Sequence, residues 1–104
     1  MGLENEKINL YTKNRAIVER KIDKAQLLVN PQTESIFHLN QMGSAIWRLL
    51  EHPTTVDEII NTVIVAFPES AEDLVKSDVQ RIFRQFVKKN LILPVGHQAT
   101  TTNT

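Results

Sequence analysis

Few side chains in this sequence are of the types that perform catalysis or bind metals. There is no cysteine, which excludes a thiolate nucleophile, disulfides and thiolate metal ligands. The histidines His38, His52 and His97 do not have the His-x-x-x-His spacing of a metal site. Asp57 and Glu58 are adjacent, but in the first turn of an expected helix they are explained by capping and by the helix dipole. We therefore predict no catalytic residues, no metal site and a protein that is not an enzyme.

Cofactors, nucleic acids and membranes have equally little support. The glycines Gly2, Gly43 and Gly96 are too isolated to form a phosphate-binding loop, so no cofactor is expected. Lys and Arg together number 12, as do Asp and Glu, and this neutral balance argues against a nucleic-acid partner. No stretch approaches the roughly 20 apolar residues that span a bilayer. With a polar N-terminus that lacks a signal sequence, the chain is expected to be soluble and cytoplasmic, with no membrane partner.

The first half of the chain is predicted to form β-strands. Mixed or apolar runs over residues 16–22, 25–29 and 35–39 are separated by short turn sequences. Loops this short are most simply accommodated by a three-stranded antiparallel meander. So small a sheet needs helices on one of its faces.

Two short helices are predicted next. Asn40 can accept a hydrogen bond from an amide of the first helical turn, which places the start of a helix over residues 41–50. Thr55, with Glu58 three residues later, forms a capping-box signature for a second helix over residues 56–66.

A third and longer helix is expected after Pro68. Ser70 followed three residues later by an aspartate indicates its start, and it reaches about Lys89. Asn90 suits a left-handed C-terminal cap. Residues 91–93 then pack back or add a short extended piece.

These elements predict a single α+β domain of winged-helix-like layout, a three-stranded antiparallel β-meander followed by three α-helices. At 104 residues the chain is long enough for one modest core. We assign residues 1–14 to a flexible N-terminal segment, residues 15–95 to the domain and residues 96–104, which are rich in threonine, to a disordered tail.

Several positions within residues 15–93 form a family-like pattern. They are Arg15 at the first strand, the Phe37, Leu39 and Asn40 group, the Ala45, Ile46, Trp47, Leu49 and Leu50 helix, the run 55–59, the pair Asp78 and Val79, and Phe86 with Leu91. This pattern resembles the PqqD family, the small peptide chaperones of pyrroloquinoline quinone biosynthesis, and related domains that recognise precursor peptides of ribosomally made natural products. Asn90 stands where the family usually has glycine, and asparagine is the next-best residue for a left-handed cap.

The resemblance implies a non-enzymatic chaperone that captures the leader of a ribosomally made precursor peptide and presents it to a modifying enzyme, often a radical S-adenosylmethionine (radical SAM) enzyme. It also implies that the third strand and the third helix line the groove. A sheet edge carries unpaired amides and carbonyls, which an extended peptide can complete as a new strand. The candidate peptide-binding residues are Ser35, Ile36, Phe37, His38, Leu39, Lys76, Val79, Gln80, Phe83, Arg84 and Val87.

One flank of the third helix is expected to contact the peptide. We expect Phe83 and Val87 to receive apolar peptide side chains, and Lys76 and Arg84 to attract acidic ones. On this reading the substitution Phe83→Ala weakens binding without unfolding the domain. The alternative is that residues 91–95 of the chain itself cover this flank.

The period-two alternation of a strand makes a separate prediction for residues 35–39. Phe37 and Leu39 should face the core, whereas Ile36 and His38 should face outward.

Two other functions are compatible with this layout. A winged-helix DNA-binding or transcription-associated module is one, and its basic residues would be Arg81, Arg84, Lys88 and Lys89. The other is a homodimer formed through the exposed strand edge, by exchange of the first strand.

Overall fold

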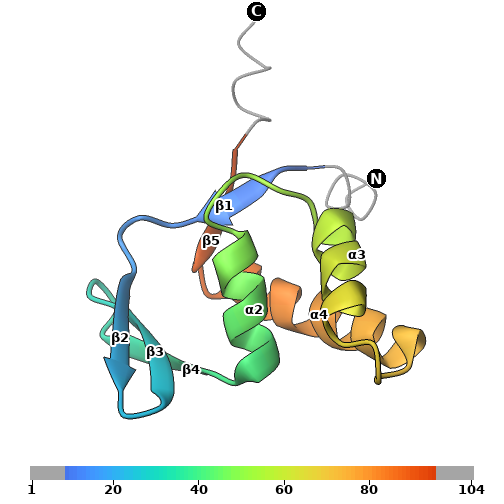
Figure 1. The fold of residues 1–104 in the computed structure, drawn as a ribbon. Coiled ribbons are helices and arrows are strands. Elements are labelled where there is room, and N and C mark those ends of the chain that lie inside the picture. The colour runs from blue at the N-terminus through green and yellow to red at the C-terminus, as the bar shows by residue number, and fades with distance from the viewer. Residues whose placement is uncertain (1–8, 96–104) are drawn as a thin grey trace, which may run out of the picture.

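Two antiparallel sheets and three helices make up residues 9–95, the part of the chain that the computed structural model describes (Figure 1). The expected disorder of residues 96–104 and the expected flexibility of residues 1–8 fall outside this range. The helices lie to one side of the larger sheet, which extends away from them (Figure 1). This arrangement confirms the predicted α+β fold class.

The larger sheet contains β2 (Val18–Ile22), β3 (Ala25–Asn30) and β4 (Ser35–Leu39) in the order β2-β3-β4, all antiparallel. The predicted meander is confirmed. Its first strand begins two residues later than expected, because Asn14 organises a turn. The side-chain oxygen of Asn14 accepts a hydrogen bond from the Ala16 amide at 3.0 Å.

The smaller sheet was not predicted in full. It pairs β1 (Tyr11–Lys13) with β5 (Ile92–Pro94), so that Tyr11 lies opposite Pro94. Tyr11 and Lys13 are both buried. The expectation of a flexible segment up to residue 14 is therefore wrong for Tyr11–Lys13, because this strand pairs with β5 and buries side chains. The extended piece expected near residues 91–93 is confirmed as β5.

The helices are α2 (Gln41–Leu49), α3 (Val56–Ala66) and α4 (Glu72–Lys88). The predicted caps of the first two are present, since side-chain oxygens of Asn40 and Thr55 accept amide hydrogen bonds of the first turn. None of the helices among the described residues has the length and hydropathy needed to cross a membrane.

The sequence prediction is wrong for the residue that caps the start of α4 and correct for the residue that follows its end. The cap residue at its start is Ala71, which makes no side-chain hydrogen bond, so the predicted cap by Ser70 is wrong. The acidic Glu72 and Asp73 stand in the first turn, where they complement the helix dipole instead. After the helix, Asn90 has a φ of 59°, which confirms the expected left-handed residue.

Edge-to-face aromatic contacts join the elements around the core. Phe86 on α4 contacts Phe37 on β4 and Trp47 on α2, with ring centroids 5.7 and 5.8 Å apart. Phe83, also on α4, contacts Tyr11 on β1 at 5.1 Å. The aliphatic members of the buried cluster surround these rings, and they include Leu28, Leu39, Ile46, Leu50, Ile59, Val63, Val75, Val79 and Ile82.

A buried lysine links three elements near one end of the core. Only 8% of Lys13 is exposed, and its Nζ lies 2.8 Å from Glu51 Oε1, 3.2 Å from Glu19 Oε2 and 4.9 Å from the Trp47 ring centroid. Trp47 Nε1 donates to the same Glu19 carboxylate at 2.9 Å. Arg15 adds an ion pair to Glu51 at 3.4 Å. These contacts fix β1 against β2 and against the end of α2.

This cluster makes folding stability depend on pH. The hydrogen bond and charge of Lys13 lower the pKa of Glu51 below its ordinary value of 4.5, and Arg15 adds to the effect. Because the folded-state pKa is the lower one, this stabilisation is present above pH 4.5 and is lost as the pH falls through the folded-state pKa.

We expect Glu51→Gln to flatten the acid-side decline in the free energy of unfolding, measured by urea unfolding across pH. The exposed loop glutamate Glu69, changed to Gln, should leave the decline unchanged, and an equal slope for both variants would contradict this assignment.

The sequence analysis expected Phe83→Ala to leave the domain folded, but the burial of Phe83 leads us to expect a loss of stability. Phe83 is 3% exposed and packed against Tyr11, so Phe83→Ala should lower the free energy of unfolding by about 3–5 kcal/mol. Leu74 on the same helix is 66% exposed, and Leu74→Ala should change it by no more than about 0.5 kcal/mol. Chemical denaturation measures the free energy of unfolding of both variants. Equal stability of the two would contradict the assignment of Phe83 to the core.

Candidate functional site

The two edge strands of the larger sheet differ in charge. Strand β2 carries Glu19, Arg20 and Lys21 at its centre, and charged side chains on an edge discourage the addition of another strand. Strand β4 has no Asp, Glu, Lys or Arg along Ser35–Leu39. Within residues 9–95 no strand pairs with the outer edge of β4. This edge is therefore the one suited to accept an extended chain.

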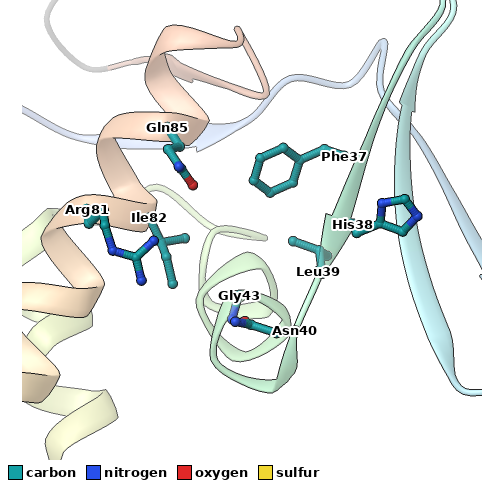
Figure 2. Close-up of a pocket in the computed structure, with 8 residues that line it drawn as sticks. All are labelled: Phe37, His38, Leu39, Asn40, Gly43, Arg81, Ile82 and Gln85. Carbon is teal, nitrogen blue, oxygen red and sulfur yellow. The ribbon is translucent and has the colours of Figure 1, made fainter.

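A cavity of about 240 Å³ lies between β4, the start of α2 and one face of α4 (Figure 2). It adjoins the uncharged strand, three of whose residues line it. Its lining residues come from all three elements and are Phe37, His38, Leu39, Asn40, Gly43, Arg81, Ile82 and Gln85.

The strand wall of the cavity follows the pleat of β4. Phe37 and Leu39 point toward α4, whereas the side chain of His38 points to the other side of the strand (Figure 2). Ile36 is 58% exposed. The predicted alternation is confirmed, with Phe37 and Leu39 directed inward and the two intervening residues outward.

The strand-to-helix junction shapes the base of the cavity. The amide of Gly43 donates to Asn40 Oδ1 at 2.7 Å, which fixes the first turn of α2 against the end of β4. A Cβ on Gly43 would lie 3.2 Å from Asn40 Oδ1 and 3.3 Å from Leu39 Cδ2. The absence of a side chain at Gly43 therefore allows the helix start to approach the strand closely.

The helix wall of the cavity combines an apolar residue with two polar ones. Ile82 is buried, whereas Arg81 and Gln85, one turn apart, are exposed. Arg81 lies 3.4 Å from Asp78 Oδ1, and both side chains are more than half exposed. Such a pair contributes little to stability, so the guanidinium can exchange partners at low cost. None of the residues lining the cavity is a carboxylate.

The predicted peptide-binding residues of the strand and of the helix lie differently with respect to this cavity. Phe37, His38 and Leu39 line the cavity. None of the six residues predicted on the helix lines it, and these are Lys76, Val79, Gln80, Phe83, Arg84 and Val87.

Two of the six residues predicted on the helix are buried. Val79 is fully buried, and Phe83 is covered by Tyr11. That Phe83 receives a peptide side chain stays a prediction, although this residue is only 3% exposed here. The alternative, cover by residues 91–95, is closer to the structure, because β5 packs against α4 and β1 joins it there. Arg81, Ile82 and Gln85 line the cavity and were not among the residues predicted from the sequence.

Nothing in the described part of the chain forms a metal centre. No group of three or more His, Asp or Glu side chains within residues 9–95 is placed to hold a metal ion. His38 lies on β4 and His52 in the turn after α2, and His97 falls outside the described residues. The geometry is that of a strand edge and an adjoining pocket.

Comparison with known proteins agrees with this geometry, which is that of a winged-helix-like domain with an open strand edge. The family described as Coenzyme PQQ synthesis protein D (PqqD) matches residues 26–92, from β3 to β5. The chain belongs to the PqqD family. The matched region contains every residue that lines the cavity.

A solved structure gives a second point of comparison. It is described as TbiB1 in complex with the TbiA(beta) leader peptide, and it is 28% identical to this chain with a TM-score of 0.65. The similarity covers 82% of this chain and 95% of that one. No curated protein matches the sequence.

The cap at the strand-to-helix junction can be tested directly. Asn40→Ala removes the oxygen that accepts from Gly43 and should lower the free energy of unfolding by about 1 kcal/mol. Asn40→Asp keeps an accepting oxygen at this position and should retain most of the stability. Urea unfolding measures both, and an equal loss in the two variants would contradict the capping role.

Proposed function

We propose that this protein is a non-enzymatic peptide-binding chaperone. In this role it captures the leader region of a ribosomally made precursor peptide and presents it to a modifying enzyme. Membership of the PqqD family supports the proposal, as does the similarity to TbiB1, whose structure is described as a complex with a leader peptide. Ribosomally made peptides are available in the cytoplasm, where this function would be performed.

The observation that carries the proposal is the uncharged edge of β4 beside a cavity shared with α4. An extended peptide placed there would complete the backbone hydrogen bonds of the edge. Its alternate side chains would point toward Phe37, Leu39 and Ile82. Backbone pairing supplies affinity for any extended chain, and the cavity adds selectivity. Micromolar binding, equivalent to roughly 8 kcal/mol, is the expected scale for this kind of groove.

The partner in this function is an enzyme that acts on the presented peptide. A radical SAM enzyme is the candidate implied by the family resemblance.

A homodimer formed by strand pairing would use the same β4 edge, since the β2 edge carries Glu19, Arg20 and Lys21. Peptide capture and such dimerisation would therefore compete, and light scattering with and without a bound peptide would detect this.

Two tryptophan variants on α4 distinguish the cavity face from the flank first predicted. Gln85→Trp places a large side chain at the cavity and should weaken peptide binding at least about tenfold. Arg84→Trp is a matched control on an exposed residue outside the cavity, and it should leave affinity within about twofold. The measurement is a fluorescence titration with synthetic peptides from the short reading frames beside the gene.

Nuclear magnetic resonance of the labelled protein locates the binding surface in the same experiment. Amide shifts should change along Ser35–Leu39 and not along Val18–Ile22. Loss of affinity in Arg84→Trp with none in Gln85→Trp would return the site to the other flank. If no peptide binds and a low-salt mobility shift shows DNA binding, the chaperone function is rejected in favour of the DNA-binding alternative.

A further inference from the structure

The pleat of an added strand limits which peptide side chains can enter the cavity. Residues i and i+2 of an extended chain lie on one face, about 7 Å apart. On the face toward α4, one such side chain of an added strand would lie at the part of the cavity lined by Phe37, Leu39 and Ile82. The next peptide side chain on the same face would then lie within reach of another residue on the α4 wall of the cavity.

The cavity offers that neighbouring side chain a cation and no competing anion. Arg81 lines the wall directly before Ile82, and its side chain extends toward the cavity (Figure 2). No Asp or Glu is among the lining residues. Asp78, an ion-pair partner of Arg81, approaches a single guanidinium nitrogen at 3.4 Å, and both side chains are more than half exposed. Arginine binds a carboxylate most strongly through two parallel hydrogen bonds, so a peptide carboxylate can replace this contact.

We propose that the cavity selects a peptide segment in which an apolar side chain and an acidic side chain are separated by one residue, with Arg81 binding the acid. This inference rests on the proposed function and adds the chemistry of the peptide. Arg81 is then a specificity-determining residue. Gln85, one turn away, offers both a donor and an acceptor to the polar backbone of the same segment.

Other basic residues of α4 are less suited to this contact. Arg84 and Lys88 are exposed and do not line the cavity. A carboxylate bound to either would be solvated and screened by salt, and its position would not be tied to the apolar subsite. Arg84 therefore serves as the matched control for Arg81, because both are exposed arginines on the same helix.

Selection from a displayed library of random short peptides tests the inference. Three full-length proteins are used as bait, the wild type, Arg81→Glu and Arg84→Glu. The wild type and Arg84→Glu should both enrich Asp or Glu two positions from a large apolar residue. Arg81→Glu should instead enrich Lys or Arg at that position, because its carboxylate reverses the charge of the wall. Circular dichroism confirms that each variant is folded, which is expected since the Arg81 side chain is 58% exposed.

Affinities of one selected peptide then quantify the contact. Replacing its acidic residue by the neutral amide should weaken binding to the wild type about tenfold, and should have little effect on Arg81→Gln. Peptides that bind at β4 without an enriched acid, or an unchanged preference in Arg81→Glu, would overturn this inference and leave the chaperone function intact. If no bait selects any peptide, both the inference and the proposed function are rejected.

Discussion

The ring of Phe86 holds the site together, because it meets Phe37 from β4 and Trp47 from α2 in edge-to-face contacts with centroids 5.7 and 5.8 Å away. These contacts set the separation between the edge strand and α4. A cavity remains where the two elements diverge, next to Ile82 and Gly43. The aromatic cluster is thus both the centre of the core and the support of the candidate binding surface.

Two flanks of helix α4 differ in what packs against them. On one flank Phe83 is sealed by Tyr11 of β1, whose pairing with β5 brings the two ends of the described chain together. On the other, Arg81 and Gln85 line the cavity beside β4. The wide apolar stripe on this helix therefore reflects burial on two sides, by the sheet and by the small β1–β5 pair. The proposed peptide capture would use the side that residues 9–95 do not cover.

Much of the fold follows from local chemistry. The caps at Asn40 and Thr55, the left-handed Asn90 and the alternation along Ser35–Leu39 all depend on residues close in sequence, and each is present in the structure. Strand β1 was missed because three residues of mixed polarity carry no detectable period. Of the residues that line the candidate cavity, the sequence prediction included the three on β4 and none of the three on α4, because which flank of α4 borders the cavity depends on tertiary packing.

The amino-acid sequence alone determined the order of the three-stranded meander and the three helices, the lack of thiol chemistry and the family resemblance, because propensity, capping and turn residues act over a few positions. Tertiary structure decided which apolar residues of α4 pack against β1 and which line the cavity. Phe83 and Ile82 are neighbours of similar character, and only the pairing of β1 with β5, about eighty residues apart in sequence, covers the first with Tyr11 and leaves the second beside the cavity. Contacts so distant in sequence are not encoded in any local pattern.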